Sequence, residues 1–283
     1  MKLATIRVQN GTRAVKLAGD VLLDLGAPDL GAFLTDARWA SLAASADSGD
    51  APVYAAADVN FAPLVPAPSK VVCVGLNYRT HIQEMGRDFP EYPTLFAKFA
   101  DCLIGANDEI VRPDETDRLD WEAELAIVVG RTVRRPSTAE AEAAIAGFTI
   151  LNDITARDWQ FRTREWLQGK IWDSSTPVGP YLVTPDELPG EVRPTLNVTL
   201  TVDGEVMQSD TTADLCFDPV ALIEYVSTIV RLNPGDIIAT GTPGGVGHAQ
   251  KPERYLVGGE TVVVEIDGLG RLENRIVKVQ SRT

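Results

Sequence analysis

The sequence predicts a β-rich protein of the α+β class. Short apolar runs that end at glycine, or at an Asp-Gly or Asn-Gly pair, recur along the 283 residues and are typical of strands joined by tight turns. Helix starts are well marked but few, and they do not alternate with the strands. This pattern favours an α+β domain over a doubly wound parallel sheet, in which strands and helices would alternate.

Residues 1–68 are expected to form a small N-terminal domain with a linker. Asn10-Gly11 follows one apolar stretch and precedes another, which is typical of a β-hairpin turn. Residues 63–68 contain three prolines, which favour a stiff and extended chain. We therefore expect a second and larger domain over residues 69–283.

Five further strands are expected in the larger domain. Each is a short apolar run bounded by glycine, by proline or by a turn pair such as Asp203-Gly204 or Asp267-Gly268. The expected strands are residues 70–74, 125–129, 148–151, 196–202 and 261–266.

Three helices are expected between these strands. Ser137 and Glu140 have the spacing of a capping box, which predicts an alanine-rich helix directly after Ser137. Asp218 precedes a proline, a typical helix start, and the apolar residues that follow recur at helical spacing. Thr155 can cap a third helix over residues 156–168.

The negative net charge of the chain argues against nucleic acid as a partner. With 40 acidic and 26 basic residues the formal net charge is −14, and such a surface repels the phosphate backbones of nucleic acids. No apolar run reaches the roughly 18 residues that a membrane helix needs, and the first residues lack the apolar core of a signal peptide. We therefore expect a cytoplasmic protein that binds neither nucleic acid nor membrane.

Histidine and cysteine are too scarce for a zinc-type site. The chain has two histidines, His81 and His248, and its three cysteines are scattered without a C-x-x-C pair. Any metal site must then use mainly oxygen ligands, which points to Mg²⁺ or Mn²⁺ rather than Zn²⁺ or Cu²⁺.

Three carboxylates near strand ends form a candidate metal site. Glu122 and Glu124 are two residues apart at the start of a strongly apolar strand, so both point to one face and could share a cation. The alternative is a solvated strand edge with an acidic face. Asp153 follows the strand at residues 148–151, and although it could simply cap a helix, with the two glutamates it completes a set of three oxygen ligands.

A histidine and a glutamate form a candidate acid–base pair. Glu84 follows His81 by three residues, so on a helical turn the carboxylate could orient the ring and raise its basicity. The alternative is an ordinary surface pair. Residues 85–90 contain a glycine and a proline and could form a mobile lid beside the pair.

Lys170 is a candidate for binding an anionic substrate. It lies between Trp166 and Trp172 in the sequence, where from these residues alone a surface cation–π contact is the simpler interpretation. Residues 240–247 form a glycine-rich stretch whose backbone N–H groups could also bind an anion, although a plain turn explains it equally. The chain has no G-x-S-x-G motif, which disfavours a serine hydrolase.

Taken together and in order, these motifs resemble those of the fumarylacetoacetate hydrolase family. The resemblance extends over residues 70–277, and although each motif alone is weak, the ordered set is highly specific. The motifs include Gly75-Leu76-Asn77-Tyr78, Asp120-x-Glu122-x-Glu124, Asn152-Asp153-x-Thr155-Ala156-Arg157-Asp158, Gly169-Lys170 and Thr240-Gly241-Thr242-Pro243.

The resemblance implies a fold and an assembly. The expected fold is a mixed β-sandwich roll with a small N-terminal α/β appendage, and the expected assembly is a homodimer. The resemblance also implies Mg²⁺ or Mn²⁺ held by Glu122, Glu124 and Asp153. One departure is Trp172, where many members carry phenylalanine, and it leaves the size of the pocket open.

The resemblance also implies roles for the other candidates. His81 and Glu84 would activate a water, and Lys170 would stabilise negative charge on the substrate. The substrate's oxygen atoms would be held by Gln160, Thr242 and Tyr78, and by Arg157 unless that residue only braces Asp153.

The expected reaction is hydrolysis of a C–C bond in a 1,3-diketo acid of the acylpyruvate or fumarylpyruvate type, a small 2-oxo acid. Two alternatives within the same fold are decarboxylation of oxaloacetate and isomerisation or decarboxylation of a dienedioate, which use the same enolate without attack by water. A non-catalytic metal- or ligand-binding protein is the alternative of another class. The pairing of His81 with Glu84 argues against it, because binding alone needs no base.

Overall fold

The protein's structure is a computed structural model that describes residues 1–47, 49 and 52–278. In this part of the chain the larger sheet has 12 strands. They are β1 (Lys2–Val8), β2 (Gly11–Ala18), β3 (Val21–Asp24), β4 (Val53–Ala55), β5 (Asn60–Phe61), β6 (Val71–Gly75), β7 (Thr94–Lys98), β8 (Leu103–Ile104), β11 (Ala123–Val129), β12 (Ile145–Asn152), β14 (Thr176–Val183) and β17 (Ile237–Ala239).

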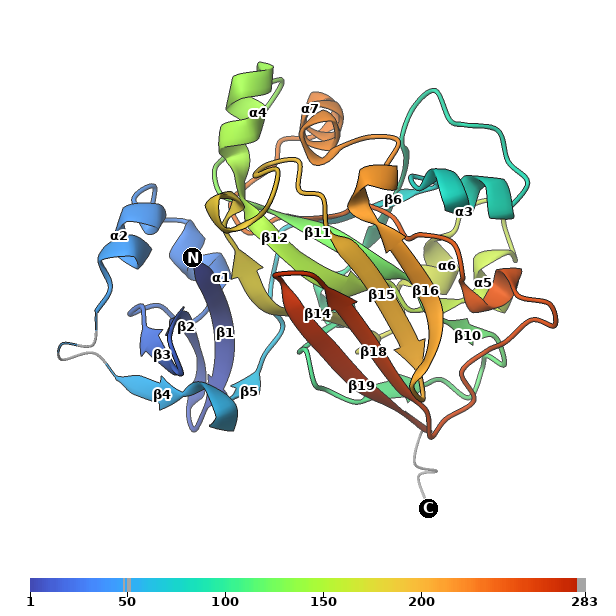
Figure 1. Cartoon of the computed structure of the whole chain (residues 1–283), viewed down its shortest axis with the longest axis horizontal. Helices are drawn as coiled ribbons and strands as arrows, with labels where there is room; N and C mark the ends of the chain where they lie inside the picture. Colours follow the sequence, from blue (N-terminus) through green and yellow to red (C-terminus); the bar gives the residue numbers. More distant parts are fainter. Residues whose placement is uncertain (48, 50–51, 279–283) are drawn as a thin grey trace.

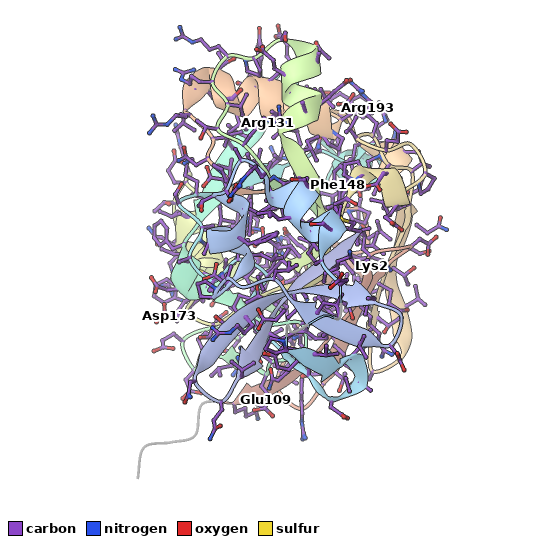
Figure 2. All side chains as sticks on the ribbon, turned by 90° about the vertical axis from the view of Figure 1, so that its left-hand side faces the viewer. Lys2, Glu109, Arg131, Phe148, Asp173 and Arg193 are labelled. Carbon is purple, nitrogen blue, oxygen red and sulfur yellow. The ribbon has the colours of Figure 1, made fainter. Side chains whose placement is uncertain are left out.

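The order of this sheet joins the N-terminal segment to the rest of the chain. It runs β4-β3-β2-β1-β14-β12-β11-β17-β6-β7, with β5 paired to β1 and β8 to β14. The junction is the antiparallel pair β1–β14, in which Leu3 lies opposite Leu182. In Figure 2, which looks onto this edge, the N-terminal strands lie across the side of the molecule nearest the viewer. The division into domains at residue 68 stays a prediction.

A second sheet covers one face of the first (Figure 1). Its strands, in spatial order, are β16 (Glu205–Thr211), β15 (Asn197–Val202), β18 (Thr261–Ile266), β19 (Gly270–Lys278) and β9 (Ile110–Arg112). A separate short pair joins β10 (Leu119–Asp120) to β13 (Thr155–Ala156). Leu125 and Phe148 from the large sheet share one buried core with Leu200 and Val264 from the second. The expected β-rich sandwich with few helices is therefore confirmed.

The helices are short and lie at the ends of strands. Within the described residues they are α1 (Leu30–Leu34), α2 (Trp39–Ser45), α3 (Arg79–Glu84), α4 (Thr138–Ala144), α5 (Arg157–Gln160), α6 (Leu167–Lys170) and α7 (Pro219–Ile229). Single 3-10 turns are η1 (Ala56–Asp58), η2 (Ala100–Cys102), η3 (Pro185–Glu187), η4 (Thr212–Asp214) and η5 (Gly247–Ala249). None of the helices described is long and apolar enough to cross a membrane.

Two of the three helix predictions are confirmed, and the third is wrong in its length. The capping box of Ser137 opens α4 and the side chain of Asp218 caps α7. The continuous helix expected over residues 156–168 is instead two single turns, α5 and α6. They fold against each other because Gly169 has no side chain: a Cβ there would lie 2.5 Å from the Cβ of Gln160. Tertiary packing has overridden the local helix pattern.

Candidate active site

The large sheet brings the predicted site residues to one end of its strands. β11 and β12 are antiparallel, with Ala123 opposite Asn152, so the start of β11 lies beside the end of β12. Glu122, Glu124 and Asp153 therefore meet, although Asp153 follows Glu122 by 31 positions in the sequence. A cavity of about 190 Å³ opens above them. It lies below the roughly 300–1,000 Å³ typical of drug-sized ligands and suits a small acid.

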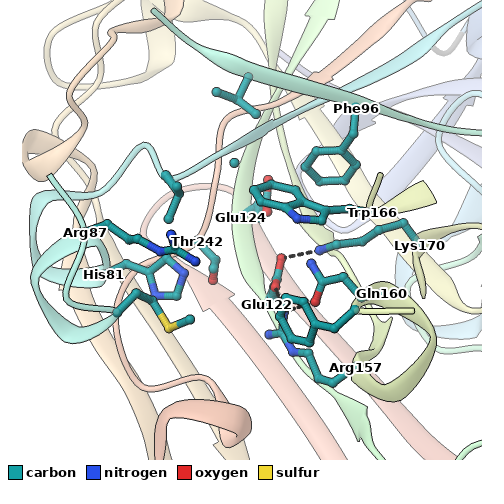
Figure 3. Close-up of a pocket in the computed structure, with 15 residues that line it drawn as sticks. His81, Arg87, Phe96, Glu122, Glu124, Arg157, Gln160, Trp166, Lys170 and Thr242 are labelled. Atoms are coloured by element: carbon teal, nitrogen blue, oxygen red, sulfur yellow. Dashed lines mark hydrogen bonds and ion pairs between the residues drawn. The ribbon is translucent and has the colours of Figure 1, made fainter. Parts of the chain in front are cut away.

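The three carboxylates form a tight buried cluster. One oxygen of each lies within 4.8 Å of the other two, and all three residues are buried. Two of the three are neutralised by cations. Lys170 Nζ lies 2.8 Å from Glu122 Oε2 and 2.9 Å from Asp153 Oδ2 (Figure 3). Lys98 Nζ lies 2.9 Å from Asp153 Oδ1 on the other side. The pairing leaves Glu124 as the carboxylate without a cation among these contacts.

The pKa values follow this unequal pairing. Burial alone would raise the pKa of Glu122, but Lys170 and Arg157 outweigh it and hold this pKa at about 2. For Glu124, burial and the neighbouring charges of Asp153 and Glu122 raise the pKa well above its ordinary value. Burial would lower the pKa of Lys170, but the two carboxylates outweigh burial and raise it, so the ammonium stays protonated.

This donor set fits a hard divalent cation. Three buried carboxylate oxygens converge, and the one hydrogen bond that Glu124 accepts from the described part of the chain comes from the backbone N–H of Gly241, at 2.8 Å. A divalent cation beside Glu124 would relieve the repulsion that raises its pKa. All of the ligands are oxygen atoms, as Mg²⁺ and Mn²⁺ prefer.

The predicted acid–base pair lies on α3 at the wall of the cavity. His81 lines the cavity and is 8% exposed, and its Nδ1 lies 3.3 Å from Glu84 Oε2. The Glu84 carboxylate in turn accepts the N–H of Gly245, at 3.1 Å from each of its oxygens. The ring is therefore fixed through Nδ1, and Nε2 is the nitrogen left to exchange a proton with a ligand.

The remaining candidates are not equivalent. Gln160, Thr242 and Arg157 line the cavity. Arg157 also binds Asp120 through Nε at 2.8 Å and Glu122 through Nη1 at 2.7 Å, so it braces a carboxylate of the cluster. Tyr78 lies outside the lining residues, is 0% exposed, and its hydroxyl has no hydrogen-bond partner within the described residues.

One interpretation from the sequence is wrong, and two site residues were missed. Lys170 does not lie at the surface: it is 1% exposed and paired with carboxylates, and its Nζ lies 4.9 Å from the centre of the Phe96 ring rather than on a tryptophan at the surface. Lys98 and Arg87 were not predicted. For Lys98, the usable signal was its position directly after the apolar residues 95–97, because an ammonium buried at the end of such a run needs a carboxylate partner. For Arg87, the signal was Gly86 before it, a residue typical of the turn that follows a helix.

Comparison with known proteins identifies similar chains. The family described as fumarylacetoacetate (FAA) hydrolase C-terminal matches residues 70–277. The mitochondrial oxaloacetate tautomerase FAHD2A of Bos taurus is 43% identical over 228 residues, which are 80% of this chain and 72% of that protein.

Two solved structures extend the likeness to the whole fold. Fumarylacetoacetate hydrolase from Exiguobacterium antarcticum superposes with a TM-score of 0.88 at 32% identity, over 98% of this chain and 99% of that one. The 2-hydroxyhepta-2,4-diene-1,7-dioate isomerase of Mycobacterium marinum gives 0.78 at 30% identity, over 99% and 100%. By name, the three similar proteins are a tautomerase, a hydrolase and an isomerase.

Proposed function

The chain belongs to the fumarylacetoacetate hydrolase family, and from this premise we propose that it interconverts the keto and enol forms of a small 2-oxo acid of the oxaloacetate type, with a divalent metal. The observation that carries the proposal is His81. Among the described lining residues it is the one imidazole, a group that can act both as a base and as an acid in catalysis. The oxaloacetate tautomerase among the relatives supports the same reaction.

Each residue has one task in this reaction. Nε2 of His81 takes a proton from the carbon next to the 2-oxo group, and the protonated ring then returns it to the enolate oxygen. Glu84 fixes the ring through Nδ1 and stabilises its positive charge. The ammonium of Lys170 stabilises the negative charge of the enolate. A divalent cation held by Glu122, Glu124 and Asp153 would act as a Lewis acid toward the same charge.

Hydrolysis of an acylpyruvate is the second candidate, and the same pair of residues favours it. His81 backed by Glu84 can remove a proton from water as readily as from carbon. One observation ranks it second: the similar hydrolase is 32% identical to this chain, whereas the tautomerase is 43% identical.

The test is a direct assay of both reactions with purified protein and added Mg²⁺ or Mn²⁺. Loss of the enol form of oxaloacetate is followed by ultraviolet absorbance against the uncatalysed rate, and acylpyruvate and fumarylpyruvate are tested in parallel. We expect faster equilibration of oxaloacetate, abolished by EDTA. Rapid cleavage of an acylpyruvate without acceleration of oxaloacetate equilibration would overturn the choice of reaction.

A further inference from the structure

Arg87 places a positive charge on the wall of the cavity that no protein carboxylate neutralises. Its side chain lines the cavity, and within residues 1–47, 49 and 52–278 its guanidinium takes part in no ion pair. The other two cationic side chains among the described lining residues, Arg157 and Lys170, are both paired with carboxylates. Figure 3 shows Arg87 beside His81, across the cavity from Lys170 and Gln160.

The backbone holds Arg87 in a defined position relative to the acid–base pair. The helix α3 ends at Glu84 with Met85 as its cap, and Gly86 follows with a φ of +62°, which is left-handed and favours glycine. The N–H of Gly86 donates to Gln83 O and the N–H of Arg87 to Ile82 O, both at 3.0 Å. These two bonds are those of a Schellman motif. The turn therefore fixes the position of the Arg87 backbone relative to His81, which lies six residues earlier on α3.

The cations on the two sides of the cavity differ in whether a carboxylate of the protein already pairs with them. Lys170 and Arg157 already neutralise carboxylates of the buried cluster. Arg87 keeps its full positive charge, and its planar fork matches a carboxylate. A ligand whose 2-oxo-carboxylate end lies at the acidic cluster can extend across the cavity to Arg87 only with its other end.

We propose that Arg87 is a specificity-determining residue that binds the distal carboxylate, so that the site selects 2-oxo dicarboxylates over 2-oxo monocarboxylates. The inference rests on the proposed function for the position of the 2-oxo-carboxylate end. It adds the recognition of the opposite end of the substrate, which neither His81 nor the acidic cluster can provide.

The first test is equilibrium binding, which does not depend on turnover. Calorimetry with Mn²⁺ present compares 2-oxoglutarate with 2-oxopentanoate, in which a methyl group replaces the distal carboxylate. We expect the parent to prefer 2-oxoglutarate by about tenfold, since hydrogen bonds to charged groups reach that factor and solvent exposure of Arg87 keeps it from being larger. Arg87→Met should remove the preference and leave the affinity for 2-oxopentanoate unchanged.

Two further variants separate recognition from general effects. Arg87→Lys keeps the charge but not the fork, and should restore part of the preference. Arg131→Met removes the same charge from an exposed residue beyond the other end of β11, about 20 Å from the acidic cluster along the strand. It should bind both acids as the parent does.

The second test is kinetic. With oxaloacetate, Arg87→Met should raise KM by about tenfold and change kcat little, because the distal contact is made equally in the ground state and the transition state. A parent that shows no preference for the dicarboxylate, or an Arg87→Met variant that keeps it, would overturn the inference. If the parent binds 2-oxoglutarate with the preference but does not accelerate oxaloacetate equilibration, the proposed reaction fails and the role of Arg87 stands. Binding of neither acid would overturn both.

Discussion

Replacing Lys170 with methionine tests how the buried cluster is held together. Nζ of Lys170 lies 2.8 Å from Glu122 and 2.9 Å from Asp153, and the side chain is 1% exposed. Removing one partner of a buried ion pair leaves an uncompensated charge and destabilises a protein by about 3–5 kcal/mol. Each kcal/mol shifts the Tm of a domain near this size by roughly 2–4 °C. We therefore expect Tm in EDTA to fall by roughly 6–20 °C.

The same change should strengthen cation binding while it weakens the fold. Without the ammonium of Lys170, the three carboxylates keep one fewer compensating charge, so they attract Mn²⁺ more strongly. The rise in Tm on adding Mn²⁺, measured by scanning calorimetry against EDTA, should therefore be larger in Lys170→Met than in the parent. Turnover should fall, because the cation that stabilises the enolate is gone.

A matched surface variant gives the baseline for this experiment. Lys278→Met removes the same charge from an exposed residue at the end of β19 and should stay within the roughly ±0.5 kcal/mol of ordinary surface substitutions. If Lys170→Met is as stable as this control in EDTA, the ion pairs do not hold the cluster. If Mn²⁺ raises its Tm by less than that of the parent, the electrostatic reasoning is refuted.

Three further predictions concern the base, the metal and the lid. His81→Gln should slow tautomerisation by about 10²–10⁴-fold and leave the calorimetric affinity for Mn²⁺ unchanged; parent-like turnover would rule out a proton-transfer role. Burial and the charges of Asp153 and Glu122 raise the pKa of Glu124, so the metal-free parent loses stability as pH rises from about 4.3 toward that raised pKa. In EDTA melts, the Tm of Glu124→Gln should therefore rise relative to that of the parent as the pH increases above about 5, and the variant should bind Mn²⁺ more weakly. A difference in Tm that does not change with pH would contradict this sign. Hydrogen exchange over residues 78–92 should slow on adding oxalate and Mg²⁺, and unchanged exchange would count against a lid.

Local sequence was enough to find the acidic cluster and some of the strands, but not strands such as β14 and β19. The strand expected over residues 261–266 has the same bounds as β18, because a bounded apolar run with β-branched residues carries its own signal. The spacing of Glu122 and Glu124 at a strand start was equally local. Asp153 could be added because it directly follows a strand, and the antiparallel register of β11 and β12 then brings it to them.

What the sequence could not supply were contacts between distant segments. Lys98 and Lys170 are buried because both reach Asp153, and no pattern within β7 or α6 specifies that meeting. The helix expected over residues 156–168 is broken by packing at Gly169, which a propensity argument does not include. The role proposed for Arg87 depends on the turn at Gly86 and on the cavity opposite, neither of which composition or periodicity defines.

The pairing of β1 with β14 has a consequence for how the chain folds during synthesis. The pairing of Leu3 with Leu182 cannot form until Leu182 has been synthesised. At roughly 5–20 residues per second, the ribosome needs about 10–40 s to make the chain between them. During that time β1 can form its hairpin with β2 and can pair with β5 through Ile6 and Arg7, but β14, the partner of Lys2 and Leu3, has not yet been made. Such an exposed strand edge is a template for association with other chains, so the edge of β1 at Lys2 and Leu3 is open to such association until β14 is made.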